Sequence, residues 1–131
     1  MFERIGEMSV DQALNVVRDT DTEIAKLHAR QMRALARIAE LRADPKTGKA
    51  EFVGAEVAME MRWSRHAGDR KVDVATDLVQ RLPDTVAALG AGAIDLAKAT
   101  AVLDLTAPLK VESARQVEQV VLTRAGTQTL R

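Results

Sequence analysis

Apolar residues recur at alternating steps of three and four along the first third of the chain. Side chains at that spacing lie on one face of an α-helix, as in the seam of a coiled coil. Ser9 is a suitable N-cap, so the pattern predicts a helix from about Ser9 to Ala43 that buries this face. We call the face the seam, and it consists of Val10, Ala13, Val17, Thr20, Ile24, Leu27, Gln31, Ala34, Ile38 and Leu41.

The seam is neither uniform nor isolated. Thr20 and Gln31 are polar interruptions within it. The stripe is widened by Leu14, Met32 and Leu35, so the helix has apolar surface for more than one partner helix. The segment 19–22 consists of Asp and Thr, which have low helix propensity. One long helix and two helices in series are therefore both compatible with the sequence.

Turn and capping residues divide the rest of the chain into short helical segments. Pro45 and Gly48 end the first helix, and Gly126 is expected to close the last. The intervening helices are expected over residues 55–62, 65–82, 84–89, 96–105 and 111–124. We predict an all-α fold with a long amphipathic N-terminal helix or helix pair, followed by a helix-turn-helix-like bundle of short helices. The expected organisation is a helical arm over 1–43, a linker over 44–54 and a helix-turn-helix-like domain over 55–131.

Composition excludes several classes of protein. Hydrophobic residues make up 47% of the chain, which is too many for a disordered segment. No apolar run reaches the roughly 20 residues that cross a bilayer. The chain has no Cys and an acidic N-terminus unlike a secretory signal. We therefore expect a cytoplasmic protein without a membrane segment.

No pattern of catalytic or cofactor-binding residues stands out. His28 and His66 lie far apart, and the sequence has neither a Gly-rich phosphate loop nor a nucleophile elbow. Asp69 and Asp73, one helical turn apart, are more typical of a solvent-facing pair than of a metal site. We expect no catalytic residues, no metal, no cofactor and no small-molecule substrate, and hence no enzyme.

Charge is balanced overall but polarised along the first helix. The chain has 19 basic and 19 acidic residues, whereas a nucleic-acid-binding domain usually has a basic excess. Residues 1–25 carry six acidic and two basic side chains, and residues 26–42 carry five basic and one acidic. This polarity suits the helix dipole on a solvated face. The alternatives are a face that contacts phosphates, or antiparallel pairing with a second copy through residues 10–41.

Residues 56–72 have the pattern of a helix-turn-helix motif. Ala58 is small enough for close helix packing, Trp63 can fill the turn, and Ser64 can cap the second helix. A recognition helix directs the side chains of its first turns into the major groove, where Arg reads guanine and phosphate. The candidate DNA-binding residues are Arg62, Ser64, Arg65, His66, Arg70 and Lys71, with Arg30, Arg33 and Arg37 as further contacts to the DNA backbone.

Two positions depart from this motif. Arg62 stands where the turn usually has Gly. Gly68 stands where the recognition helix usually has a branched apolar residue, and it is expected to loosen that helix. An ordinary helical corner is therefore the alternative interpretation of this segment.

Three phrases of the chain, Ala55 to Ala75, Leu82 to Ala99 and Thr106 to Leu109, follow one another in the order and spacing of a known family. In these phrases, and in its amphipathic N-terminal helix, the chain resembles the actinobacterial 13E12 repeat family. The shared region of that family is known as domain of unknown function 222. Within the second phrase, Leu-Pro-x-x-Val and the following Gly-x-Ile are also similar to the helix-turn-helix region of ParB-type chromosome-partitioning proteins.

The resemblance implies a DNA-related role without nuclease activity. Members of the 13E12 family often continue into a C-terminal HNH endonuclease module. This chain contains no His-Asn-His finger, so a mobile-element or nuclease-associated protein that lacks the HNH module is expected. Whether the chain is a fragment of a longer protein stays open.

We therefore predict a DNA-binding helical domain similar to those of the 13E12 family. The alternative is a helical dimerisation or protein-interaction module, in which the seam pairs two chains and no DNA is bound. The fold discriminates between them. Residues 30–42 and 62–71 on a common face would favour DNA, whereas an exposed seam with residues 62–71 hidden would favour protein pairing.

Overall fold

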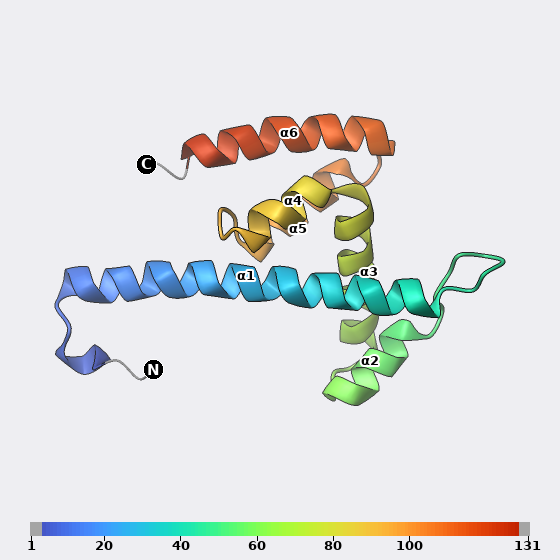
Figure 1. Ribbon diagram of the computed structural model, residues 1–131, viewed down its shortest axis with the longest axis horizontal. Helices are drawn as coiled ribbons and strands as arrows, with labels where there is room; N and C mark the ends of the chain where they lie inside the picture. Colours follow the sequence, from blue (N-terminus) through green and yellow to red (C-terminus); the bar gives the residue numbers. More distant parts are fainter. Residues whose placement is uncertain (1–3, 129–131) are drawn as a thin grey trace.

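The computed structural model describes residues 4–128, and every regular element in that range is a helix (Figure 1). The predicted all-α fold is confirmed, with a long first helix followed by shorter ones. The elements are η1 (Ile5–Glu7), α1 (Val10–Arg42), α2 (Val53–Met61), α3 (Arg65–Arg81), α4 (Pro83–Gly90), α5 (Leu96–Thr106) and α6 (Val111–Gln128).

Helix α1 is one uninterrupted helix. The Ser9 hydroxyl accepts a hydrogen bond from the Gln12 amide at 3.2 Å, and the Gln12 side chain accepts one from the Ser9 amide at 3.0 Å. The two residues thus form a capping box, as expected of a Ser at this position. The helix continues through segment 19–22, so the sequence encodes one helix rather than two in series. Its 33 residues make a rod about 50 Å long.

The buried face of α1 is not the seam. The buried residues of this helix are Ala25, Ala29, Met32, Leu35 and Ala39, and α1 packs with them against α3 and α4. Ile24, Leu27 and Leu41 are exposed, and Ile38 is half-buried. Within this chain the seam is therefore not buried as a continuous face, and of these four residues only Ile38 packs against the core. Alanines allow a closer approach of two helix axes than Leu or Ile, so the neighbouring stripe became the inner face.

A single core joins the C-terminal half of α1 to the later helices. Leu78, Leu82 and Leu89 are fully buried and belong to the same cluster as the inner face of α1. Residues 25–42 are thus part of the bundle rather than of a separate arm. No residue of α1 before Ala25 is buried, and this half of the helix extends past the other helices (Figure 1).

Two predicted boundaries need correction. Helix α2 begins at Val53, inside the predicted linker over 44–54, because Val53 is itself a core residue. Helix α6 does not close at Gly126 but continues to Gln128. The remaining helices end within two residues of the predicted bounds.

Helices α2 and α3 cross at a contact where both backbones need glycine. A Cβ at Gly68 would overlap the Gly54 carbonyl oxygen and would lie 2.8 Å from the Cβ of Ala58. A Cβ at Gly54 would overlap the side chain and backbone of Asp69. Gly68 therefore does not loosen α3, as its helix propensity suggested. It is the residue that lets α3 approach α2.

A buried carboxyl group fastens α6 to the first turn of α4. Glu118 Oε2 accepts hydrogen bonds from the Thr85 amide at 2.8 Å and from the Thr85 hydroxyl at 2.7 Å, and both side chains are fully buried. The Thr85 amide, in the first turn of α4, also donates to the Leu82 carbonyl at 3.1 Å, so its hydrogen bond is shared between the two acceptors. Glu118 thus supplies a hydrogen-bond acceptor to the start of α4 although it is 33 residues away from Thr85 in the sequence.

The glycine contact predicts the sign of a substitution. Gly68→Ala should lower the free energy of unfolding by about 1–3 kcal/mol through overpacking, although Ala favours helix by about 1 kcal/mol. Gly90→Ala is the matched control, because a Cβ there would lie at an ordinary 3.5 Å from that of Ala29. Urea denaturation of both variants measures the difference. A Gly68→Ala protein more stable than the wild type would contradict the packing described for α2 and α3.

The Glu118 contact predicts a graded loss. Glu118→Ala should destabilise the protein by about 1–3 kcal/mol, because the buried Thr85 hydroxyl loses its acceptor while the Thr85 amide keeps only the Leu82 carbonyl. Glu118→Gln retains an acceptor oxygen and should lose less than half as much. Thermal denaturation monitored by circular dichroism checks the ranking, and equal losses in the two variants would refute it.

Candidate functional site

A tight turn over residues 62–64 joins α2 to α3. The Trp63 amide donates to the Ala58 carbonyl at 2.9 Å, and the Ser64 hydroxyl accepts from the Ala67 amide at 3.0 Å, which caps α3 as predicted. Between them Arg62 adopts the left-handed conformation, with φ of 56°. The residue that departs from the motif thus keeps the backbone of a glycine turn, at a steric cost of about 1–2 kcal/mol.

The predicted DNA-binding residues of this corner differ in their surroundings. Arg62, His66 and Arg70 are exposed. Arg65 is exposed but forms an ion pair with Asp69 at 3.2 Å. Lys71 is half-buried, and its Nζ lies 4.9 Å from the centroid of the Trp63 ring. The Ser64 hydroxyl is occupied as the helix cap.

Acidic residues share this surface of α3. Asp69, Asp73 and Asp77 lie at successive four-residue steps and so form one stripe along the helix. Partial burial and the neighbouring Asp73 raise the pKa of Asp77, and Arg81 partly offsets that rise. Asp73 and Asp77 are exposed, whereas Asp69 is half-buried beside Gly54. Exposed carboxylates on this helix oppose the approach of DNA phosphates.

The three arginines of α1 lie away from α3. Arg30, Arg33 and Arg37 follow a three-and-four spacing on α1. At 100° per residue Arg30 and Arg37 fall nearly opposite the buried stripe, whereas the guanidinium of Arg33 reaches to Gly90 of α4. Arg37 forms an ion pair with Glu40 at 2.8 Å. Because α3 packs on the buried side of α1, the structure does not bring these arginines together with residues 62–71 on one face.

The seam forms a nearly continuous apolar stripe on the outside of the bundle. Val17 is 65% exposed, Leu27 59% and Leu41 65%. Val10, Leu14 and Ile24 extend the exposed apolar surface toward the free end of α1. Monomeric proteins rarely leave contiguous apolar surface of this kind uncovered unless it has a partner.

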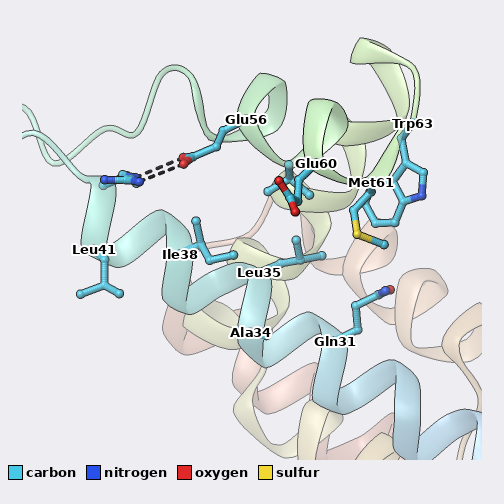
Figure 2. A pocket seen from close by; sticks show the side chains of 11 residues that line it. Gln31, Ala34, Leu35, Ile38, Leu41, Glu56, Glu60, Met61 and Trp63 are labelled. Atoms are coloured by element: carbon cyan, nitrogen blue, oxygen red, sulfur yellow. Dashed lines mark hydrogen bonds and ion pairs between the residues drawn. The ribbon is translucent and has the colours of Figure 1, made fainter.

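A groove of about 600 Å³ opens along the C-terminal half of the seam, between α1 and α2 (Figure 2). Figure 2 shows Leu35 and Ile38 of α1 facing the same space as Met61 and Trp63 at the end of α2. The groove is lined by Gln31, Ala34, Leu35, Ile38, Leu41, Arg42, Glu56, Val57, Glu60, Met61 and Trp63.

An ion pair closes one end of this groove. Arg42 donates to both carboxyl oxygens of Glu56, at 3.1 and 2.9 Å, and this hydrogen bonding lowers the pKa of Glu56. The sequence analysis gave no sign that Met61 would line a groove. That groove depends on the angle between α1 and α2, which no local pattern contains.

Metal-binding clusters and membrane-spanning helices are both absent from the part of the chain that the structure describes. Residues 4–128 contain no group of three or more His, Asp or Glu side chains placed to hold a metal ion. None of the described helices is both long and apolar enough to cross a membrane.

Comparison with known proteins identifies the family. Neither the curated proteins nor the solved structures contain a match to this chain. One family model matches residues 14–129, which covers α1 from its second turn onward together with all later helices, and its description is domain of unknown function (DUF222). The resemblance noted in the sequence is thereby confirmed, and the chain belongs to the DUF222 family.

Proposed function

We propose that this domain is a helical dimerisation module that self-associates through the seam of α1. The observation that carries the proposal is the nearly continuous apolar stripe left on the outside of a 33-residue helix. The fold turns alanines inward and leaves Val, Ile and Leu side chains without partners in their own chain. Of the features that distinguish the sequence-based hypotheses, the exposed seam favours protein pairing, whereas residues 62–71 are largely exposed and do not meet that hypothesis. The separation of Arg30 and Arg37 from residues 62–71 does not favour DNA.

The energetics require most of the seam to take part. Burying an exposed Val, Leu or Ile side chain completely is worth about 1.5–3 kcal/mol. Association costs roughly 4–15 kcal/mol in lost translational and rotational freedom. Two or three buried side chains would therefore not hold a dimer together. Pairing along most of α1 supplies enough, because the seam runs from Val10 to Leu41.

DNA binding is the second candidate, and one observation favours it. A tight turn with a left-handed Arg62 and a Ser64 cap joins α2 to α3, and Arg62, His66 and Arg70 are exposed around the start of α3. A dimer would present two such corners, as helix-turn-helix dimers do. The acidic stripe of α3 and the zero net charge weigh against this role.

Dimerisation through the seam predicts the effect of one charge on α1. Leu27→Asp should raise the dimer dissociation constant at least 100-fold, because each of the two chains would bury a carboxylate in place of an aliphatic side chain. Leu105→Asp on α5 is the matched control, since Leu105 is 60% exposed against 59% for Leu27. Sedimentation equilibrium measures both variants. A wild-type protein that stays monomeric up to about 100 μM, or a dimer that only Leu105→Asp disrupts, would refute the proposal.

DNA binding predicts a salt dependence that two arginines control. Replacing Arg65 and Arg70 by Ala should reduce the slope of log affinity against log salt by about 2, because each phosphate contact contributes about 0.9. Replacing Arg115 and Arg124, both exposed on α6, should leave the slope unchanged. Fluorescence anisotropy with a duplex measures both. Absence of binding at 50 mM salt removes this candidate.

A further inference from the structure

We infer that the partner of α1 is α1 of a second copy in antiparallel orientation, with its N-terminal half seated in the groove between α1 and α2. This inference rests on the proposed dimerisation and adds the direction, the register and the contribution of α2. Three independent features of the molecule support it: the order of residues along the seam, the charges beside the seam, and the position of the groove.

When two copies of α1 are aligned antiparallel, the seam of one copy matches the seam of the other. In an alignment centred between Ala25 and Lys26, each apolar position of one helix meets an apolar position of the other. The two polar interruptions, Thr20 and Gln31, meet each other. A shift of one heptad would place each of them against an apolar residue, which leaves polar groups without partners. The layers are Val10 with Leu41, Ala13 with Ile38, Val17 with Ala34, Thr20 with Gln31 and Ile24 with Leu27.

The charges beside the seam select the antiparallel direction. In that direction the acidic half of each helix lies along the basic half of the other, and Glu23 faces Arg30 of the second copy. Glu23 lies 3.4 Å from Lys26 of its own helix and keeps that contact on the exposed flank. A parallel pair would instead bring acid against acid, and Arg37 next to Arg42 of the second copy. Like charges at these flanking positions discriminate strongly between partners.

The groove lies beside the part of α1 that this register pairs with the N-terminal half of the second copy. Its α1 wall contains Ala34, Ile38 and Leu41, the residues that the alignment places opposite Val17, Ala13 and Val10 of the second copy. Those N-terminal residues belong to the half of α1 that has no fully buried side chain in its own chain. The volume of about 600 Å³ is within the range of pockets that bury several apolar groups.

The second wall of the groove, formed by α2 and Trp63, adds side chains to the interface beyond those of α1. Leu14 of the second copy is level with Ile38 in this register and falls on the side of its helix that faces α2. Met61 of α2 and Trp63 after it line that wall of the groove. Each dimer has two such grooves related by the twofold axis.

Cysteine pairs test the direction and the register, because the chain has no cysteine of its own. Val17→Cys and Ala34→Cys are placed at exposed positions of one layer. The double variant should form a covalent dimer under mild oxidation. Neither single variant should, because identical residues would lie about 25 Å apart along the antiparallel pair. Asn15→Cys combined with Ala34→Cys, with Asn15 off the seam, sets the background level.

The outcomes separate this inference from dimerisation itself. A disulfide between two Val17→Cys chains would show parallel pairing and overturn the inference. A dimer in sedimentation whose double variant does not exceed the background would overturn the register and leave dimerisation standing. A monomer in sedimentation would overturn both.

Substitutions in α2 test the groove. Met61→Asp should raise the dimer dissociation constant at least tenfold although Met61 is outside α1. Met59→Asp should not, because Met59 is 84% exposed and lies outside the groove, against 48% for Met61. Circular dichroism of both variants establishes that they fold. An unchanged dissociation constant for a folded Met61→Asp protein would overturn the assignment of the groove to the second copy.

Discussion

Close packing of the alanine stripe of α1 against α3 and α4 is the constraint on which the rest of the domain depends. Ala25, Ala29 and Ala39 have side chains short enough for the helices to approach closely, and Met32 and Leu35 fill the space between them. Once this stripe is turned inward, the larger aliphatic residues of the adjacent stripe are turned outward. The exposed seam is therefore a direct consequence of how the core is built.

The close approach of α2 to α3 determines where the end of α2 lies. Gly54 and Gly68 allow α2 and α3 to cross with their backbones nearly in contact, and this crossing fixes where the end of α2 stands relative to α1. Met61 and Trp63 then face Leu35 and Ile38 across a groove instead of filling it. Two crossings that need small residues thus create the only apolar groove along the seam in the described part of the chain.

Local signals in the sequence predicted the elements well and their packing poorly. Ser9 and Ser64 cap their helices by accepting a hydrogen bond from the amide three residues later. Such a cap depends only on residues that are close in sequence, so it can be predicted from the sequence. The choice between two neighbouring stripes of α1 depends on which helices lie beside it. The same holds for Glu118, whose partner Thr85 is a residue of another helix, and for the role of Gly68 in the α2–α3 contact.

The candidate site could also be predicted only in part, because some of its features depend on neighbouring residues and others on how the helices pack. The exposure of Arg62, His66 and Arg70 follows from the capped turn before α3, which the sequence contains. The ion pair of Arg65 with Asp69 follows from their four-residue spacing on one helix. The separation of Arg30, Arg33 and Arg37 from the α2–α3 corner depends on how the helices pack, which the sequence pattern does not contain.

Amide hydrogen exchange in residues 10–24 of α1 is the most direct test of pairing through the seam. This half of the helix has no buried side chain in its own chain, so an unpaired copy should exchange these amides quickly. The account predicts that protection of residues 10–24 rises with protein concentration over the range in which dimers form, while protection of α5 stays constant. Fast exchange of residues 10–24 at every concentration, with α3 fully protected, would contradict it.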